Sequence, residues 1–428
     1  MEHALDPMLV AHYRDRPTGA EAWLVVDTFL HGVAGGGIRM APDVNETLMT
    51  NLAATMSVKL SVLRPPCGGA KCGIRYDARA SDSKQVLHRV LRAFAPFLQN
   101  CWVTGSDLGT DWHDIVSGCR EHADIPHPQF ALMKAYGGNS HDAVEAGIER
   151  LKQGTSLIVD ESIRLGMSDA VTGWTVCAST IEAYALRHES VKGKRVAIQG
   201  FGSVGGSAAK FLAEAGAVIV AVSDELGAVV ARDNAGLDIP SLLAMRTEPA
   251  RKIIDREQLR ARHDYLLSDR NDVLYQPVDI LIPAAGSYIS IDIERIQATL
   301  IAEGANDPFT PDQEIALHNN GITVIPDAIA NSGSAGLYGL LVAGSIPISK
   351  DAILDFLQRQ VQEMTRRVLE HRSTPPRPAL ETLARARIQD SIREGHSPLP
   401  NGFTTEELQS LQSDDLHIYY RGATAYAV

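Results

Sequence analysis

The sequence predicts an α/β protein of two domains, the second built around a parallel β-sheet with helices on both faces. Short apolar runs, typical of strands buried on both faces, occur at residues 278–285, 299–306 and 322–326. Stretches with helical periodicity separate such runs, and this alternation favours a parallel sheet. At 428 residues, the chain is long enough for two or three domains with cores of their own.

The composition argues against several classes of function. Hydrophobic residues make up 45% and charged residues 21% of the chain, as in ordinary globular proteins. The formal net charge of -12 argues against a general nucleic-acid binder, because neutralising phosphates requires a basic surface. The longest uncharged run near the C-terminus, residues 332–349, is interrupted by Gly, Ser and Pro, so it does not indicate a membrane span. We therefore expect neither nucleic acid nor a membrane as a partner.

The five cysteines are an odd number in a large chain, which indicates reduced thiols. Cys67 and Cys72 could form a metal or redox pair. No second Cys or His pair at zinc-like spacing accompanies them, so we expect small buried hydrophobic residues and no metal site. The N-terminus lacks the basic-then-apolar pattern of a signal peptide, and we expect a cytoplasmic protein.

The first part of the chain predicts a strand, a glycine turn and a helix. Residues 21–30 are mainly apolar and lead to Gly35, Gly36 and Gly37. Three glycines allow close approach of a backbone, although a flexible turn is the simpler explanation. Residues 47–63 then show helical spacing of apolar side chains, Met56 among them. Lys59 lies beside that apolar stripe, where a snorkelling lysine is the simpler explanation.

Lys71 follows two glycines in a stretch without another charge between Arg64 and Arg75. It is either a solvated loop lysine or lies in a cleft, where burial disfavours the ammonium form and allows acid–base chemistry. Asp107 stands where a predicted strand gives way to a glycine-containing turn, a position where loops carry chemistry. An Asx-turn or a helix cap is the alternative explanation for Asp107.

The clearest local signal is Gly200-Phe-Gly202-Ser203-Val204-Gly205. It follows a predicted strand, opens a predicted helix over 207–215 and precedes a strand over 218–224 that ends in an acidic residue. This context predicts a Rossmann-type βαβ unit that holds a pyrophosphate at the helix N-terminus. A Rossmann core that binds no nucleotide is the alternative. Residues 162–173 are expected to form a loop, and 226–277 to be polar and irregular.

Asp224 and Glu225 end the second predicted strand, where the adenosine ribose hydroxyls would arrive. No Arg or Lys follows them before Arg232. A 2′-phosphate would therefore meet two carboxylates, which favours NAD over NADP. NADP is not excluded, because insertions at the sheet edge can reshape this corner. Beyond the sheet, residues 352–369 predict an amphipathic helix capped by Ser349, and the last ~30 residues an appendage.

A series of motifs in a fixed order resembles the glutamate/leucine/phenylalanine/valine dehydrogenases. The motifs are Gly36-Gly37-Ile-Arg-Met, Met56-Ser-Val-Lys59, Gly68-Gly69-Ala-Lys71, Ser106-Asp107-Leu-Gly-Thr110, Val171-Thr172-Gly173, residues 200–205, Pro283-Ala284-Ala285, Glu303-Gly-Ala-Asn306 and Pro326-Asp-Ala-Ile-Ala-Asn331-Ser-Gly333. The resemblance covers about residues 30–340, and the order of the motifs is far more specific than any single one.

The resemblance implies an enzyme that converts an amino acid, NAD(P)+ and water reversibly into a 2-oxo acid, ammonium and NAD(P)H. It implies a catalytic and oligomerisation domain over 1–150, a Rossmann domain over 151–335, and C-terminal helices over 336–428 that pack back on the first domain. It also implies a homo-oligomer and a small-molecule substrate.

Roles for individual residues are likewise implied by the resemblance. Lys59 would bind the substrate α-carboxylate, Lys71 would polarise the carbonyl oxygen and activate water, and Asp107 would move protons to and from the amino nitrogen. The other implied substrate-side residues are Gly36, Gly37, Met56, Asn331 and Tyr338. The implied cofactor-side residues, besides the fingerprint, Asp224 and Glu225, are Thr172, Ala284, Ala285, Asn306 and Asn331.

Two departures from the family pattern concern the substrate. Glutamate-specific members carry a lysine where this chain has Gly35, and a serine seven residues after the position of Asn331, where it has Tyr338. A substrate carboxylate would lose charge-assisted hydrogen bonds of about 1.5–3 kcal/mol each. We therefore expect a neutral, apolar or aromatic amino acid. The alternatives are glutamate in an atypical pocket, a non-proteinogenic amino or imino acid, and a catalytically silent paralogue.

Overall fold

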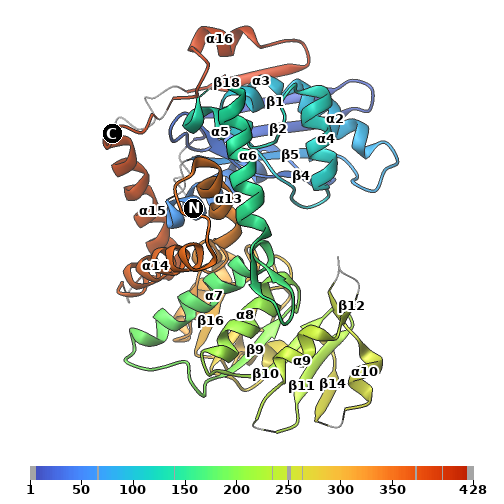
Figure 1. Cartoon of the computed structure of the whole chain (residues 1–428), viewed down its shortest axis with the longest axis vertical. Helices are drawn as coiled ribbons and strands as arrows, with labels where there is room; N and C mark the ends of the chain where they lie inside the picture. Colours follow the sequence, from blue (N-terminus) through green and yellow to red (C-terminus); the bar gives the residue numbers. More distant parts are fainter. Residues whose placement is uncertain are drawn as a thin grey trace. The chain divides into compact units, whose positions relative to one another are not determined.

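The computed structural model describes residues 6–64, 67–138, 140–233, 235–247, 252–262, 264–371, 374–397 and 399–421. The chain, coloured by sequence position in Figure 1, divides into two compact units. The first unit comprises Met1–Lys152, Ala335–Ser345 and Ala384–Val428. The second unit comprises Gln153–Ser334 and Ile346–Leu383.

The first unit contains a mixed sheet of seven strands in the order β18-β1-β2-β5-β3-β6, with β4 also paired to β5. Its strands are β1 (Leu9–Asp15), β2 (Ala20–Val26), β3 (Ala34–Gly35), β4 (Ile38–Met40), β5 (Gly68–Arg75), β6 (Trp102–Val103) and β18 (Leu416–Tyr420). Its helices include α1 (Glu46–Leu63), α2 (Ser83–Ala93), α3 (Ala95–Asn100), α4 (Trp112–His122), α5 (Phe130–Gly137) and α16 (Thr405–Ser410). Helix α6 (His141–Ser156), α13 (Gly333–Ala343) and α15 (Pro376–Arg393) include residues of both units.

Lys71 lies on a strand, not on a loop. Strand β5 runs antiparallel to β2 and parallel to β3 and β4, and every residue from Gly68 to Ile74 is buried. A Cβ atom at Gly69 would overlap the backbone of Ser57, so glycine lets α1 pack directly on β5. Gly-Gly-Ala has a low strand propensity, and the tertiary packing overrides it here.

The second unit contains a sheet in the order β14-β11-β10-β9-β15-β16-β17, and the five strands from β10 to β17 are parallel. The predicted parallel sheet is confirmed. Its strands are β9 (Arg195–Gln199), β10 (Val218–Asp224), β11 (Gly227–Ala231), β14 (Tyr265–Ser268), β15 (Ile280–Pro283), β16 (Leu300–Ala302) and β17 (Thr323–Ile325). The stretch 226–277 is more regular than predicted, because β11 adds to the sheet antiparallel to β10, and β14 adds to it antiparallel to β11.

The remaining elements of the second unit are helices and two small hairpins. These are β7 (Ile158–Asp160), β8 (Leu165–Gly166), α7 (Met167–Ala185), α8 (Ser203–Glu214), α9 (Ile239–Ala244), β12 (Arg246–Thr247), β13 (Ile253–Ile254), α10 (Arg256–Arg260), α11 (Pro311–Asn319), α12 (Asp327–Ala330), α14 (Lys350–Leu369), and the 3₁₀ turns Arg270–Tyr275 and Ile293–Arg295. The loop predicted over 162–173 is wrong from Met167 onward, because α7 begins there and packs on α8.

Two expectations about the C-terminal part of the chain differ from the structure. Helix α14 buries Leu357, Val361 and Met364 and packs on α7, so residues 346–383 belong to the second unit instead of returning to the first. The predicted cap is present, since the Ser349 side chain accepts a hydrogen bond from the Ala352 N–H. Strand β18 pairs antiparallel with β1, so residues 416–420 belong to the main sheet and are no appendage.

Residues 422–428 of that stretch lie outside the described part of the chain. Within the described part, none of the helices combines the length and the apolar character that a membrane span requires.

Candidate active site

Lys71 and Asp107 form an ion pair in the first unit, with Nζ and Oδ2 2.6 Å apart. Lys71 is 8% exposed, and the Asp107 side chain is 21% exposed. Asp107 follows β6 in a turn in which Thr110 Oγ1 accepts a hydrogen bond from the Asp107 N–H and donates one to the Ile38 carbonyl. The structure therefore brings together two predicted residues that are 36 positions apart in the sequence and fixes the turn that carries one of them.

Burial raises the pKa of Asp107, but the Lys71 ammonium and the Arg39 guanidinium lower it by more, so the net pKa is below its usual range. Arg39 Nε lies 3.3 Å from the same Oδ2 atom. Asp107 is consequently an ionised carboxylate at neutral pH, held between two cations. Arg39 was not predicted as a site residue, although it belongs to the Gly36-Gly37-Ile-Arg39-Met motif.

The other predicted residues of the first unit lie on the elements around this pair. A Cβ atom at Gly37 would lie 3.4 Å from Asp107 Cβ and 3.1 Å from the Ser106 carbonyl oxygen, so this glycine faces the turn of Asp107. A Cβ atom at Gly36 would overlap the Ala70 carbonyl, so Gly36 permits the close approach to β5. Lys59 is buried on α1, the helix that packs on β5.

Position 35 borders an apolar cluster. A Cβ atom at Gly35 would lie 3.2 Å from Val103 Cγ2 and 3.4 Å from Cys67 Sγ. Both residues belong to a cluster that also includes Met56 and, from α13, Ala335 and Val342. Tyr338 is half-buried on the same helix, in the part that belongs to the first unit.

Cys67 and Cys72 are buried free thiols, as predicted. Burial raises the pKa of Cys67 to about 12, so this thiol is neutral at physiological pH.

In the second unit, the fingerprint glycines form the turn between β9 and α8. Gly200 has a φ of 89°, and a Cβ atom there would lie 2.8 Å from both the Ala284 carbonyl oxygen and Ala285 Cβ. A Cβ atom at Gly202 would meet nothing within 4 Å, so the backbone is open to a ligand at this position. Fingerprint and strand-end residues predicted for the cofactor are therefore neighbours.

Two cations that sequence reasoning missed lie at the N-terminus of α8. Lys252 Nζ donates to Ser203 Oγ at 2.6 Å and lies 2.7 Å from Asp169 Oδ1. Arg246 donates to the Gly202 carbonyl at 3.2 Å and stacks on the Phe201 ring. Both come from the region expected to be irregular, more than 40 residues after the fingerprint, and no local pattern marked them. A helix N-terminus with two cations suits an anionic group.

The structure corrects the prediction that no cation accompanies Asp224. Asp224 is buried and pairs with Arg256, and its carboxylate also accepts hydrogen bonds from the Leu226 and Ile254 N–H groups. A cation from α10 therefore does accompany Asp224, 32 residues along the chain. Glu225 is exposed beside it. Arg256 lies beyond Arg232, outside the stretch on which the sequence-based prediction depended, so the prediction missed it.

Three residues predicted for the nicotinamide side lie at the strand ends of the second unit and at α7. The Asn331 amide donates to Asn306 Oδ1 at 3.1 Å and contacts the Gly304 carbonyl at 3.4 Å. Thr172 Oγ1 lies 2.7 Å from Ser334 Oγ. The buried Asn331 Oδ1 has no hydrogen-bond partner among the described residues, so it is available to a donor on a ligand.

Arg377, at the first turn of α15, joins the segments that carry Asn306 and Asn331. It donates to Glu303 at 2.8 Å, to Asp327 at 2.9 Å and to Glu314. Burial raises the pKa of Glu303 well above its usual range, although Arg377 opposes this effect. Sequence reasoning missed this cluster, because its members lie in four separate segments.

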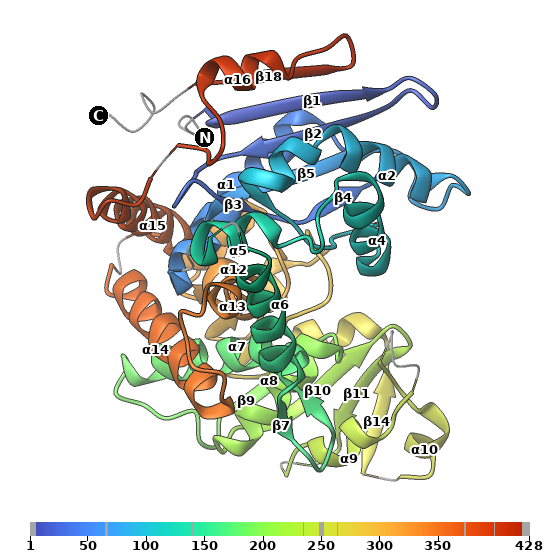
Figure 2. The same cartoon turned by 45° about the horizontal axis from the view of Figure 1, so that its top comes forward.

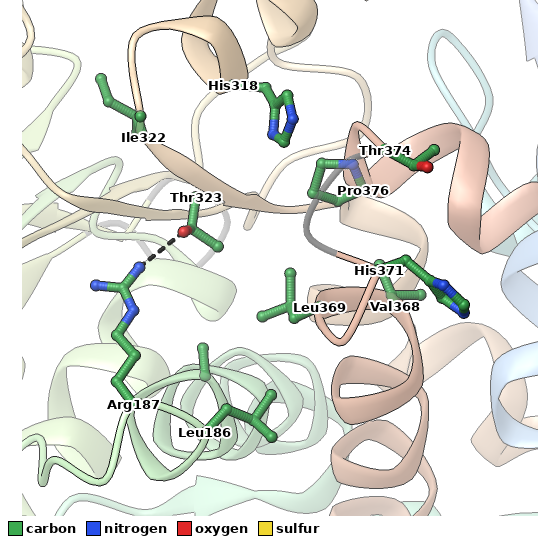
Figure 3. Close-up of a pocket in the computed structure, with 12 residues that line it drawn as sticks. Leu186, Arg187, His318, Ile322, Thr323, Val368, Leu369, His371, Thr374 and Pro376 are labelled. Carbon is green, nitrogen blue, oxygen red and sulfur yellow. Dashed lines mark hydrogen bonds between the residues drawn. The ribbon is translucent and has the colours of Figure 1, made fainter.

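Two cavities occur away from these contacts. In the second unit, a cavity of about 370 Å³ lies between α7, α11 and the end of α14, and Figure 3 shows Arg187 donating to Thr323 Oγ1 beside it. None of the predicted site residues lines it. In the first unit, a cavity of about 340 Å³ borders Cys67 and Gly68 at the start of β5.

Comparisons with known proteins identify the family of the chain. The family model "Glutamate/Leucine/Phenylalanine/Valine dehydrogenase" matches residues 166–391, and "Glu/Leu/Phe/Val dehydrogenase, dimerisation domain" matches residues 11–121. The NADP-specific glutamate dehydrogenase of Saccharolobus shibatae is 32% identical over 300 residues, which are 70% of this chain and 65% of that protein. The NADP-specific glutamate dehydrogenase A1 of Halobacterium salinarum is 32% identical over 304 residues, 70% of this chain and 66% of that protein. The chain thus matches just under two thirds of the length of these relatives.

Solved structures show the same fold. The hetero-hexameric glutamate dehydrogenase from Thermus thermophilus, in its Leu bound form, superposes with a TM-score of 0.66 and 22% identity over 91% of this chain and 90% of that chain. The glutamate dehydrogenase from Peptoniphilus asaccharolyticus superposes with a TM-score of 0.64 and 21% identity over 91% of each chain. The resemblance stated from the motifs is confirmed: the chain belongs to the glutamate/leucine/phenylalanine/valine dehydrogenase family.

Proposed function

We propose that this protein is an NAD(P)-dependent dehydrogenase that catalyses the reversible oxidative deamination of an L-amino acid to a 2-oxo acid and ammonium. The observation that carries the proposal is the Lys71–Asp107 pair, 2.6 Å apart and mostly buried, in a chain of this family. A buried ammonium beside an ionised carboxylate forms an acid–base pair within reach of one substrate atom. The first unit would bind the substrate, and the second unit the dinucleotide.

The residues of the first unit have separate roles in this reaction. Lys59 binds the substrate α-carboxylate, and Gly37 lets the backbone approach the substrate. A nicotinamide held by the second unit would supply the hydride acceptor for the substrate Cα, so that the amino carbon becomes an imine carbon. Lys71 then orients and activates a water that adds to the imine carbon. Asp107, which is ionised, accepts a proton from that water and passes it to the amino nitrogen, which leaves as ammonia, and Lys71 stabilises the oxygen that becomes the keto group.

The residues of the second unit suit a dinucleotide. Gly202 leaves space for the pyrophosphate, and Arg246 and Lys252 supply positive charge at the N-terminus of α8. The unpartnered Asn331 Oδ1 offers an acceptor for the carboxamide N–H of the nicotinamide. The test is a fluorescence titration with NADH and with NADPH. Failure of both to bind would overturn the assignment of the second unit.

We propose a neutral, apolar or aromatic amino acid as the substrate. Gly35 supplies no cation for a substrate side-chain carboxylate, and its surroundings are Val103 and Cys67. Tyr338 on α13 supplies a ring where a serine stands in glutamate-specific members. Glutamate is the second candidate, because the relatives at 32% identity are named glutamate dehydrogenases.

Assays with each proteinogenic L-amino acid and either cofactor, followed by NAD(P)H absorbance, distinguish these candidates. Leucine, valine or phenylalanine should give the highest kcat/KM. The double variant Gly35→Lys/Tyr338→Ser should raise the ratio of glutamate to leucine activity, whereas Ser81→Lys, an exposed control, should leave that ratio unchanged. Glutamate as the best substrate of the unaltered protein would overturn the neutral side-chain assignment.

Two outcomes separate the remaining alternatives. Tight NADH binding without turnover of any proteinogenic amino acid would indicate a non-proteinogenic amino or imino acid. If Lys71→Ala also left the cellular role intact, the protein would be a silent paralogue.

The proposal further includes a homo-oligomer, supported by the description of the matched dimerisation domain, and a cytoplasmic location, supported by five buried free thiols. Light scattering and cell fractionation test these two points.

A further inference from the structure

A cluster of potential metal ligands lies on α2 and α4, separate from the residues assigned to the substrate and the cofactor. It consists of His88 on α2 and of Glu121 and His122 at the C-terminal end of α4. One ligand atom from each of the three residues lies within 4.8 Å of the others. The two helices pack against each other, and both views of the molecule show them side by side (Figures 1 and 2).

The close packing of α2 on α4 positions His88. A Cβ atom at Gly118 of α4 would lie 2.8 Å from His88 Cδ2 and 2.5 Å from Leu91 Cδ1. Glycine at this position therefore lets the imidazole ring lie directly against the helix. His88 is only 9% exposed, so the ring has little freedom to rotate.

A hydrogen bond selects the tautomer of His88. Its Nε2 atom lies 3.1 Å from the Asp114 backbone carbonyl oxygen. A carbonyl oxygen only accepts, so Nε2 carries the proton and Nδ1 keeps a free lone pair. Metal-binding histidines typically donate their second ring N–H to a backbone carbonyl or a carboxylate, which fixes the ring and increases its basicity. The Asp114 carbonyl oxygen already provides such an outer partner for His88.

The side chains of Glu121 and His122 are accessible from solvent and can change their positions to reach a metal ion. Their side chains are 63% and 36% exposed, and Glu121 Oε2 lies 3.9 Å from His122 Nε2. Lys84, one turn before His88, is held by the Asp114 carboxylate at 2.7 Å. Its ammonium is therefore engaged, and the three ligands together carry the single negative charge of Glu121.

We propose that His88, Glu121 and His122 bind a divalent transition metal of the Zn²⁺ type, with water completing the coordination. Two imidazoles and one carboxylate are a donor set that zinc accepts with an open fourth position. Tetrahedral ligands at about 2.0–2.1 Å from zinc lie about 3.4 Å apart, so the exposed side chains need to close by less than about 1.5 Å. The metal would cross-link α2 to α4 and stabilise the first unit by an amount that grows with the logarithm of the free metal concentration relative to Kd.

Isothermal titration of the untagged full-length protein with ZnCl₂ tests this site, together with the visible spectrum of the Co²⁺-loaded protein. We expect saturable binding of one metal ion per chain at this site and a rise in the unfolding temperature. His122→Ala and Glu121→Gln should each weaken binding by roughly tenfold or more, because loss of even an outer partner costs 10- to 100-fold. His113→Ala, which removes an exposed histidine from the first turn of α4, should change nothing.

Absence of saturable binding would overturn the proposal, as would equal affinities of the unaltered protein and His122→Ala. A conservative His88→Gln variant keeps the ring's volume approximately and tests the buried ligand without opening a large cavity. None of these measurements depends on dehydrogenase activity, so the metal site and the proposed function stand or fall separately.

Discussion

Each unit of the molecule buries a cation among carboxylates, and the two arrangements differ in composition. In the first unit, Lys71 meets one carboxylate, Asp107, which is shared with Arg39 and remains 21% exposed. In the second unit, Arg377 meets four carboxylates: Glu303 and Asp327 are fully buried, Glu314 is 7% exposed, and Asp307, at 3.7 Å, is 21% exposed. Lys71 is thus paired with one carboxylate, whereas Arg377 is shared among several.

The difference in side-chain chemistry explains the difference in role. A lysine ammonium can lose its proton, so Lys71 beside Asp107 can take part in acid–base steps. An arginine cannot be deprotonated in proteins, but its planar fork donates to several carboxylates at once. We infer that Arg377 positions the strand ends that carry Asn306 and Asn331 and does not react itself.

Lys71→Met should reduce kcat by about 10²–10⁴-fold, the usual contribution of a positioned acid–base group. The unfolding temperature should change little, because Asp107 retains Arg39 as a partner. Steady-state kinetics and thermal denaturation measure the two quantities. Lys192→Met, which removes an exposed lysine, is the matched control. A kcat of Lys71→Met within a few-fold of that of the unaltered protein would show that Lys71 takes no part in the reaction. The proposed difference between Lys71 and Arg377 would then be wrong.

Arg377→Met should lower the free energy of unfolding by about 3–5 kcal/mol, because three buried carboxylates lose their common partner. Denaturant unfolding followed by circular dichroism measures the loss. Arg377→Lys should recover only part of it, since a lysine cannot reproduce the forked contacts. If Arg377→Met were as stable as the unaltered protein but lost turnover alone, Arg377 would belong to the reacting groups.

Asp107→Asn should reduce kcat by about 10²-fold or more while KM for the cofactor stays the same. The amide cannot accept and return a proton, although it keeps the shape of the carboxylate. Steady-state kinetics with both substrates varied separates the two constants. An increase in cofactor KM without a loss of kcat would show that Asp107 acts in binding.

Glu303→Gln should change the free energy of unfolding by only about 1 kcal/mol. Burial and the neighbouring carboxylates Glu314 and Asp327 raise the pKa of Glu303, so these surroundings disfavour its ionised form. The glutamine oxygen can still accept from Arg377. Denaturant unfolding at neutral pH measures the change, and a loss as large as that of Arg377→Met would show that the Glu303 charge is essential.

The smallest effect concerns pH. Because the net folded-state pKa of Asp107 is lowered, its ionised form contributes stability above its unfolded pKa of about 3.9, and this stability is lost as pH falls through the folded-state value. The stability difference between the unaltered protein and Asp107→Asn should therefore be largest above about pH 4 and shrink below it. Thermal denaturation across pH measures this, and a difference independent of pH would contradict the pairing.

Much of the second unit was predictable because its signals are local. The fingerprint at Gly200–Gly205 lies between a strand and a helix that are contiguous in the sequence, and the buried parallel strands have their own apolar pattern. In the first unit, the order of motifs singled out Lys71 and Asp107. Local propensity left Lys71 open between a solvated loop and a cleft, because the strand character of Gly68–Arg75 comes from packing between β2 and α1.

The sequence by itself thus determined the fold class and the family and singled out Lys71 and Asp107 as the candidate acid–base pair, because short-range patterns and motif order carry that information. Only the tertiary structure decided which distant groups meet: Arg256 at Asp224, Arg377 among its carboxylates, and β18 on β1. The same holds for His88 beside Glu121 and His122. These contacts join segments up to about 400 residues apart, and their partners are selected by packing and by the cost of burying an unpaired charge, neither of which leaves a local pattern in the sequence.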